Sequence, residues 1–483
     1  MGKYVKPALC ILLVCFPLLY NLDALAIRMW DEARLAQNAT QMYENGNVWV
    51  TYCYHVPDMW NTKPPLLIWL QVCFMHITGI NEWAIRLPAA LAVLATFIFI
   101  FRQVKSQTRS ALQAMFTVAV LVTTKGYIDL HVARTGDYEA LLILWTTIGG
   151  LSLWKYSEAG KLSSLYTASI AFALAVFTKG VAGLMFIPAI CIYLCMTQQL
   201  FPLLQSRHFY FAAALFLLIA LLPYLMREHF NPGYLHAVMD NELGGRFLEV
   251  KENNGGPWYY YLNLLAGRDY IFWFVFIPVG IWLGIKERYK VSGRLAIYSG
   301  LMGFFFLITI SISRTKLSWY DAPVYPYLAI VSAFAIHKLI LLSKKISIRF
   351  YKNTLRFFLI LFMIAYGILI RDIIWLNDAK YTQANTYNIG KYIKDKLIHR
   401  DQIKALVIYD NDCSPQVNFY MHMAEVKGYK TILANDTTDL SGKIVITQKP
   451  GNTKKLLARY HVRKIDEYFG ALVWHCISGK SAP

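Results

Sequence analysis

Residues 8–34, "ALCILLVCFPLLYNLDALAIRMWDEAR", contain the pattern on which the fold depends. The first part is an apolar run of about 20 residues, the length that crosses the hydrocarbon core of a bilayer. The run ends at Asp31 and Glu32 without the small-residue site at which a signal peptide would be cleaved. We therefore expect an uncleaved first membrane span, followed by two adjacent carboxylates directly beside the membrane.

The composition of the chain indicates many such spans. Of 483 residues, 57% are hydrophobic and only 16% are charged, and the mean hydropathy is +0.38. One soluble globule cannot bury that much apolar surface, so the sequence predicts a polytopic membrane protein. The formal net charge of +19 does not indicate nucleic acid binding, because the basic residues cluster in short segments between apolar runs.

Hydropathy along the chain predicts eleven membrane spans. They cover residues 8–27, 84–103, 110–128, 138–154, 163–178, 181–196, 208–226, 270–285, 296–313, 321–341 and 355–371. With a cytosolic N-terminus every inside loop is basic, as the positive-inside rule requires, and only Glu158 and Glu287 oppose the basic residues. The predicted transmembrane domain is residues 1–371, and the odd number of spans places residues 372–483 outside.

The outer loops, predicted at 28–83, 129–137, 227–269 and 314–320, are rich in acids. Residues 64–79 are apolar but short, and counting them as a span would invert every later loop. We interpret this segment as an amphipathic or re-entrant helix along the outer interface.

Residues 372–483 have a different pattern and are expected to form a small exoplasmic α/β domain. The patterns predict short buried strands at 404–410 and 443–448 and helices at 415–423 and 451–460. A hairpin is expected around Phe469 and Gly470. The expected fold class is thus an α-helical polytopic membrane protein with about 11 transmembrane helices, interfacial helices and this C-terminal domain. The sequence of the domain has no glycine-rich phosphate loop and no metal-ligand cluster, so we assign it no chemistry.

Ionisable residues in the outer loops stand at the ends of spans, where a charge near lipid needs a partner or a task. Asp31 and Glu32 begin an amphipathic stretch, and their plain structural use would be to stabilise the positive end of a helix dipole. Lys63 precedes two prolines that fix the backbone, which suits capture of a lipid phosphate. An interfacial lysine that merely snorkels is the commoner case.

Three further outer segments carry acids and bases. In "DLHVARTGDYEALLILW", Asp137 and Glu139 stand where the hydrocarbon begins, and acids and bases at that depth usually mark a site. "DNELGGRFLEV" has two glycines that permit close backbone approach, and "SRTKLSWYDAPVYPYL" heads a span broken by two prolines. The candidates in these segments are Asp129, His131, Arg134, Asp137, Glu242, Arg246, Arg314, Lys316, Tyr320 and Asp321.

The order of these motifs resembles that of bacterial glycosyltransferases of the GT-C fold. The motifs are an Asp-Glu pair after the first span, "KPPL", "NEWAIRLPAAL", an outer acid loop, "GGRF" and "KLSWYDAPVYP". Within that fold the chain is most similar to the superfamily of lipid A aminoarabinose transferases and protein O-mannosyltransferases, over residues 8–345. The resemblance implies transfer of a sugar from a polyprenyl-phosphate carrier to an acceptor hydroxyl on the exoplasmic face.

The resemblance also implies roles for single residues. Asp31, with Glu32 beside it, matches the carboxylate that acts as base or orients the acceptor, and Asp137 matches the second acid. The residues that match those holding the carrier phosphate are Lys63, Arg246 and Tyr320. Further substrate contacts are expected from Arg34, His131, Arg134, Glu242 and Lys316.

Two positions depart from the pattern of the aminoarabinose transferases. Those enzymes usually have Glu directly before the lysine of Lys-Pro-Pro and His in the loop before the Arg-Phe pair, and both are associated with a metal. Here these places hold Thr62 and Leu243. The departures put a bound divalent metal in doubt, and also membership of that particular activity, so no cofactor is expected with certainty.

The chemistry agrees with the implied reaction. A sugar on a lipid phosphate is already activated, so the protein need only neutralise the departing phosphate with fixed cations. A positioned carboxylate that deprotonates or orients the acceptor is worth about 10² to 10⁴ in rate. Single displacement would invert the anomeric carbon, without the second carboxylate that retaining hydrolases need.

The expected location is the bacterial inner membrane, with the site and the C-terminal domain facing the periplasm. The expected partners are the bilayer, a polyprenyl-phosphate-linked donor, and an acceptor that is lipid A or another glycolipid, a protein or an envelope glycan. A transporter or lipid flippase is the alternative, but it should show internal repeats and charges near the midplane. A membrane-anchored scaffold would leave Asp31, Lys63 and Asp137 without a task.

Overall fold

The structure, a computed structural model, describes residues 2–129, 131–245, 254–376, 388–399, 403–410 and 414–480. The chain divides into two compact units. The first unit comprises Met1–Tyr20, Met59–Leu67 and Pro88–Ile373. The second unit comprises Asn21–Asp58, Ile68–Leu87 and Ile374–Pro483. The predicted boundary at residue 372 stays a prediction.

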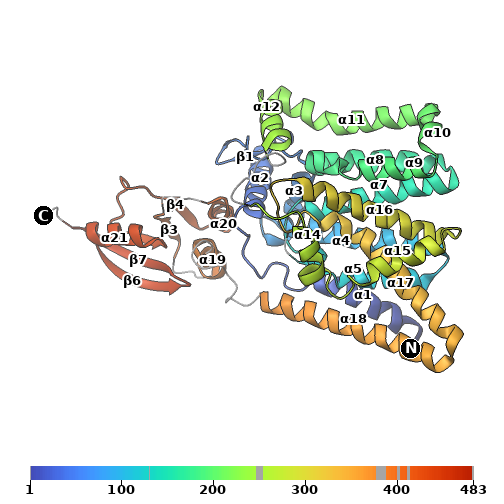
Figure 1. Ribbon diagram of the computed structural model, residues 1–483. Coiled ribbons are helices and arrows are strands. Elements are labelled where there is room, and N and C mark those ends of the chain that lie inside the picture. Colours follow the sequence, from blue (N-terminus) through green and yellow to red (C-terminus); the bar gives the residue numbers. More distant parts are fainter. Residues whose placement is uncertain are drawn as a thin grey trace. The chain divides into compact units, whose positions relative to one another are not determined.

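Long apolar helices dominate the first unit (Figure 1). Among the described residues, six helical segments are long and apolar enough to cross a membrane. They are α4 (Glu82–Thr108), α8 (Leu162–Lys179) continued by η1 (Gly180–Leu184), α11 (Arg207–Phe230), α16 (Val291–Ile312), η4 (Ala322–Val324) continued by α17 (Tyr325–Ile346), and α18 (Ile348–Leu376). The predicted class of multi-pass membrane protein is confirmed.

The predicted number of eleven spans is not confirmed. The remaining predicted spans correspond to α1 (Gly2–Leu19), α5 (Ala111–Val122), α7 (Glu139–Ala159), α9 (Ile187–Met196) and α15 (Phe276–Lys286). α5, α9 and α15 contain 12, 10 and 11 residues. Because a helix rises about 1.5 Å per residue, these three are too short for a hydrocarbon core of about 30 Å.

Short helical turns connect the long helices of this unit. They are α6 (Lys125–Ile128), α10 (Leu200–Gln205), α12 (Tyr234–Val238), η2 (Met239–Gly245), α14 (Tyr260–Leu264) and η3 (Leu265–Asp269). η2 and η3 are π-helical, a conformation that is frequent at functional sites.

Tyrosine hydroxyls form hydrogen bonds between the buried faces of these helices. Tyr327 of α17 donates to the carbonyl of Thr146 in α7 at 3.0 Å, and Tyr298 of α16 donates to the carbonyl of Gly150 at 2.7 Å. A Cβ at Gly150 would lie 2.1 Å from the Tyr327 hydroxyl, so only glycine allows this approach. The middle of α7, a helix whose first residue is Glu139, is therefore fixed against two neighbouring helices.

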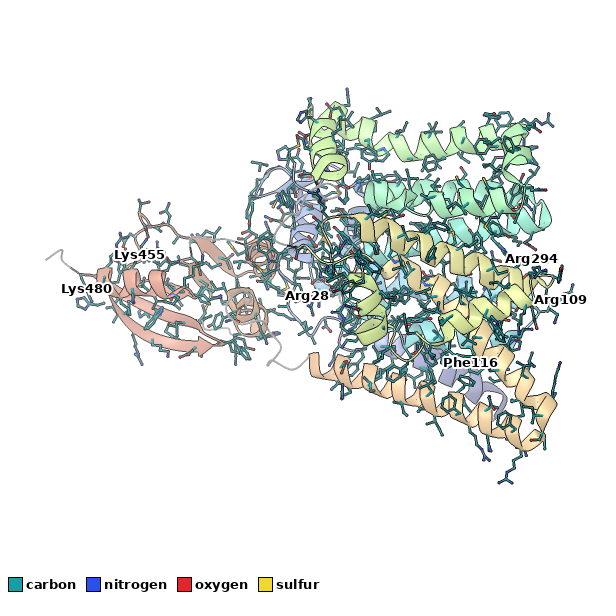
Figure 2. The ribbon with its side chains drawn as sticks, in the orientation of Figure 1. Arg28, Arg109, Phe116, Arg294, Lys455 and Lys480 are labelled. Carbon is teal, nitrogen blue, oxygen red and sulfur yellow. The ribbon has the colours of Figure 1, made fainter. Side chains whose placement is uncertain are left out.

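The basic loops lie together at one end of the first unit. Figure 2 shows Arg109 and Arg294 at the same end of the helical bundle, as expected for loops on one side of a membrane. The two acids of these loops are both ion-paired, Glu158 with Arg294 at 2.6 Å and Glu287 with Lys338 at 2.5 Å. The loops that carry Glu158, Glu287 and Lys338 are therefore neighbours, and the side of the membrane on which they lie stays a prediction.

The second unit contains the predicted C-terminal domain. Its five-stranded sheet has the order β4-β3-β5-β7-β6, where β3 is parallel to β4 and β5, and β7 is antiparallel to both of its neighbours. The strands are β3 (Ala405–Ile408), β4 (Lys430–Leu433), β5 (Ile444–Thr447), β6 (Tyr460–Tyr468) and β7 (Ala471–Gly479). The helices are α19 (Asn388–Asp395), η6 (Leu397–His399), α20 (Pro415–Val426) and α21 (Pro450–Arg459). Val407, Val445 and Leu456 belong to its small core.

Both predicted strands, both predicted helices and the hairpin at Phe469 and Gly470 are confirmed in this domain. The unit also contains α2 (Asp31–Asn45) and the two-stranded hairpin of β1 (Tyr52–Cys53) and β2 (Val56–Pro57). Within the unit, α20 packs against α2, and the Tyr420 hydroxyl accepts the backbone N–H of Ile27 at 2.8 Å. The segment expected at the outer interface forms α3 (Leu66–Thr78), and its position at that interface stays a prediction.

Candidate active site

A cavity of about 320 Å³ lies in the first unit and collects several of the predicted residues. Its lining includes Lys63, Glu242 and Tyr320 from three predicted segments, and also Glu139, Lys179 and Trp319. The remaining lining is mostly apolar and includes Leu142 and Phe306. A few charged groups in an otherwise apolar concave site are typical of ligand pockets.

The segment that carries Lys63 is held rigidly. Buried Arg227 donates to the carbonyl of Asn61 at 2.9 Å, and the Tyr234 hydroxyl donates to the carbonyl of Thr62 at 2.7 Å. The Tyr138 hydroxyl donates to the Asn61 side chain at 3.1 Å. These contacts with α11, α12 and the start of α7 fix the backbone directly before the lysine, as the two prolines do after it.

Lys63 forms an ion pair with Glu242, which lies on the π-helical segment η2. The Thr62 hydroxyl donates to the same carboxylate oxygen of Glu242 at 2.7 Å. The three side chains therefore form one hydrogen-bonded group at the edge of the cavity.

Thr62 stands where the resemblance would place a metal-associated glutamate. In the described residues, this corner offers a divalent ion one carboxylate, which already carries an ammonium and a hydroxyl. Hydroxyl and ammonium groups are not a donor set for a tightly held divalent metal. The residues at this position therefore do not fit the metal.

A second lysine, Lys179, faces the cavity from the end of α8 and forms an ion pair with Glu139, the first residue of α7. The helix ends at Lys179 because Gly180 has a φ of 59°, which L side chains rarely adopt. The Lys179 ammonium also lies 5.5 Å from the centroid of the Tyr320 ring. Sequence reasoning missed this lysine, although a lone lysine in the apolar stretch "VFTKGVAGL" was a signal.

Asp137 and His131 form a pair beside the cavity. His131 Nδ1 lies 2.8 Å from Asp137 Oδ2, and Asp137 Oδ1 accepts the backbone N–H of Tyr138 at 2.7 Å. The His131 ring stacks on Trp319, which lines the cavity, with ring centroids 3.6 Å apart. His131 has a φ of 64°, a conformation of a kind that often persists at functional sites.

The environment keeps Asp137 ionised. Burial raises the pKa of the Asp137 carboxyl, but the hydrogen bond with His131 and the charges of His131 and Lys179 lower it by more. The resulting pKa lies below the ordinary value of an aspartate. Asp137 is thus a carboxylate at neutral pH, available to orient a substrate group or to stabilise positive charge.

Lys316 and Arg134 both make structural contacts, and their predicted contacts with substrate stay predictions. The Lys316 ammonium donates to the carbonyls of Ser311 and Ser313 at 2.7 and 2.6 Å, at the end of α16, and burial lowers its pKa. A cation on the last carbonyls of a helix stabilises the negative end of the helix dipole. Arg134 likewise donates to two carbonyls, those of Pro17 and Tyr20, both at 2.8 Å.

In the second unit, Asp31 is the exposed first residue of α2. The residue before it, Trp30, is 83% exposed and has φ 69° and ψ −113°, an uncommon conformation for a side chain of that size. Strain of this kind persists only where the surroundings impose it, and it is concentrated at functional sites.

The neighbouring acid, Glu32, is buried in an ion pair with Arg86. Arg86 donates to both Glu32 oxygens at 2.7 and 3.0 Å, and to the carbonyls of Leu22, Leu25 and Ala26. Arg34, also on α2, is held by two hydrogen bonds to Asp58 at 2.8 and 2.6 Å. Both contacts give a structural account of residues predicted to act on substrate, and their catalytic or binding roles stay predictions. Arg246 and the side chain of Leu243 lie outside the described residues.

The comparisons with known proteins agree with the fold. The model of the dolichyl-phosphate-mannose-protein mannosyltransferase family matches residues 62–226. An uncharacterised protein of Aquifex aeolicus (strain VF5) is 28% identical over 338 residues, 69% of this chain and 64% of that protein. The undecaprenyl phosphate-alpha-4-amino-4-deoxy-L-arabinose arabinosyl transferase of Enterobacter sp. (strain 638) is 25% identical over 364 residues, 71% of this chain and 62% of that protein. The chain thus spans slightly less than two thirds of the length of these relatives.

The structural similarity extends over nearly the whole chain. ArnT from Cupriavidus metallidurans, crystallised with bound undecaprenyl phosphate, superposes with a TM-score of 0.75 at 14% sequence identity. The superposition covers 98% of this chain and 97% of that one. These findings give no support to the transporter alternative, and they confirm the recognition made from the sequence: the chain has the GT-C fold of ArnT and is similar in sequence to glycosyltransferases of that superfamily.

Proposed function

We propose that the chain transfers a sugar from a polyprenyl-phosphate carrier to an acceptor hydroxyl on the exoplasmic face of the membrane. The observation that carries this proposal is the shared cavity of Lys63, Lys179 and Tyr320 in the first unit. Two ammonium groups and a phenol suit a phosphate, which accepts charge-assisted hydrogen bonds. The common fold with an ArnT that binds undecaprenyl phosphate supports the same ligand class.

The two lysines act on the charge that develops during the reaction. As the bond to the sugar breaks, the carrier changes from a phosphodiester to a phosphomonoester and gains negative charge. Fixed ammonium groups beside that phosphate stabilise the developing charge without reorganisation. Before the carrier enters, Glu242 and Glu139 balance Lys63 and Lys179, so neither ammonium is buried without a counter-charge.

The acids act on the other side of the reaction. Asp31 would deprotonate or orient the acceptor hydroxyl, and Asp137, held by His131, would fix a substrate group or the positive charge that forms at the sugar. One carboxylate acting on the acceptor gives single displacement, and therefore inversion at the anomeric carbon. The membrane would be the bacterial inner membrane, with the site on the periplasmic side.

Transfer by purified protein tests the proposal. Wild type, Asp31→Asn and Lys63→Ala in detergent would be given polyprenyl-phosphate sugars and an envelope extract, and both transfer and carrier binding would be measured. We expect Asp31→Asn to lose transfer by about 10² to 10⁴ and to keep carrier binding. Lys63→Ala should bind the carrier more weakly.

Asp240→Asn provides the control, because Asp240 is exposed on the same short segment as Glu242 and pairs only with His236 among the described residues. It should behave as wild type. If Asp31→Asn transfers sugar as fast as wild type does, Asp31 is not the base. If Lys63→Ala binds the carrier as tightly as wild type does, the proposed phosphate site is wrong.

A further inference from the structure

A second cavity, of about 440 Å³, lies in the second unit at the C-terminal end of α2. Among the described residues, the lining of this cavity has no aliphatic side chain and no lysine or arginine. The residues are Gln41, Glu44, Asn45, Asn47, Tyr52 and His55. Amide, carboxylate, phenol and imidazole groups each offer donors or acceptors in a fixed plane. Such a lining suits a ligand with many hydroxyls better than an anion or an apolar peptide.

The side chains of this cavity are oriented before any ligand arrives. Asn47 Oδ1 accepts the backbone N–H groups of Trp49 and Val50 at 3.1 and 3.0 Å, and Asn45 Oδ1 accepts that of Asn47 at 2.8 Å. His422 Nδ1 of α20 lies 2.8 Å from Glu44 Oε1, and the His422 ring centroid lies 6.3 Å from that of His55. Preorganised polar groups bind with less loss of conformational freedom.

Gln41 contributes an amide of fixed orientation to the lining of this cavity. It is 2% exposed, and its Oε1 accepts the backbone N–H of His55 at 3.0 Å, which fixes the orientation of the amide. Its Nε2 has no hydrogen-bond partner among the described residues. The amide thus adds a polar group of fixed orientation to the lining.

The rim of the cavity is also strained. Cys53 pairs with Val56 in the β1–β2 hairpin, so Tyr54 and His55 are the two central residues of the turn. They have φ values of 56° and 63°. Two-residue hairpin turns with positive φ usually use glycine or asparagine, and side chains such as these are kept there at an energetic cost.

We propose that this cavity binds a saccharide chain of the acceptor, remote from the acceptor hydroxyl. This inference rests on the proposed function for the identity of the ligand as acceptor. Asp31 and Asn45 are the first and last residues of α2, which makes them about 21 Å apart along the axis and within about 40° of the same face. A saccharide of several residues bridges that distance, so the acceptor would be a glycan or glycolipid.

Binding of a soluble probe tests the site without the transfer reaction. The probe is the oligosaccharide released from lipopolysaccharide by mild acid, titrated into the full-length protein in detergent by calorimetry. We expect wild type to bind it, and Asn45→Ala and Gln41→Leu each to bind about 5- to 10-fold more weakly. Asn435→Ala removes an exposed asparagine of the same unit that lies in another turn and should bind as wild type.

Kinetics separate this inference from the proposed function. In the transfer assay, Asn45→Ala should raise KM for the intact acceptor and leave KM for the carrier-linked sugar unchanged. Wild type that binds the oligosaccharide without transferring sugar would overturn the proposed function and keep the saccharide site. Wild type that transfers sugar but does not bind the probe, or Asn45→Ala that binds it as wild type does, would overturn the saccharide site alone.

Discussion

Arg86 in the second unit and Lys179 in the first both hold a buried glutamate, but they differ in what surrounds the pair. Arg86 uses all five of its N–H groups on Glu32 and three backbone carbonyls. Lys179 has three N–H groups, and within the described chain its hydrogen-bond partner is Glu139. A fully satisfied cation maintains a fold, whereas a cation that faces a cavity with donors to spare can bind a ligand.

The largest expected effect is that of breaking the ion pair between Glu32 and Arg86. Glu32→Gln should destabilise the protein by about 3 to 5 kcal/mol, because it leaves the buried Arg86 without its counter-charge. Thermal denaturation in detergent measures the loss, and transfer per folded molecule should persist. Arg86→Met combined with Glu32→Leu should recover part of the stability. If Glu32→Gln instead abolishes transfer at unchanged stability, Glu32 is catalytic and the structural account of it is wrong.

Removing the ion pair between Lys179 and Glu139 should change transfer and leave stability unchanged. Lys179→Gln with Glu139→Gln removes both charges together, so the fold should keep its melting temperature. Transfer should fall by about 10² to 10³, the loss typical for one group that stabilises developing charge. Lys125→Gln with Asp372→Asn is the matched control, because that pair lies 2.9 Å apart in the first unit and does not line the cavity. If both double variants transfer sugar equally, Lys179 has no role in transfer beyond that of an ordinary ion pair.

A third ion pair, in the second unit, should give the smallest effect. Burial lowers the pKa of His422, but the hydrogen bond and charge of Glu44 and the charge of Glu425 raise it above the ordinary 6.5. A raised pKa in the folded state stabilises the protein below about pH 6.5 and ceases to do so as the pH rises through the raised value. His422→Gln should therefore lower the melting temperature at pH 6 by less than about 4 °C. At pH 9 the two proteins should melt alike, and an equal difference at both pH values would exclude this linkage.

The sequence predicted the elements that depend on local pattern. Strands at 405–408 and 444–447, the hairpin at Phe469 and Gly470, and the long apolar helices all follow from residue periodicity and turn chemistry. The predicted number of spans is not confirmed, because α5, α9 and α15 are apolar but short. Hydropathy does not determine where a helix ends. β4 was also missed, because only two of its four residues, KTIL, are apolar, whereas the equally short β3 and β5 are almost wholly apolar.

The candidate site depended more on tertiary contacts. Asp31 and Glu32 are neighbours in sequence, yet one is exposed and the other is buried on Arg86, because adjacent helical residues point about 100° apart. Lys316 donates to the carbonyls at the end of α16, a contact that only the fold reveals, and its predicted role in binding substrate stays a prediction. Lys63, Glu242 and Tyr320 do share one cavity, while the roles assigned to them stay predictions.

The central claim is that the cavity of the first unit holds the carrier phosphate. Equilibrium binding of undecaprenyl phosphate to wild type, to Lys63→Gln with Lys179→Gln, and to the Lys125→Gln with Asp372→Asn control tests it most directly. Two lost charge-assisted hydrogen bonds should weaken binding by about 10² or more in the cavity variant and leave the control at the wild-type affinity. Wild-type affinity in the cavity variant would show that the carrier binds elsewhere, and the proposed active site would then be wrong.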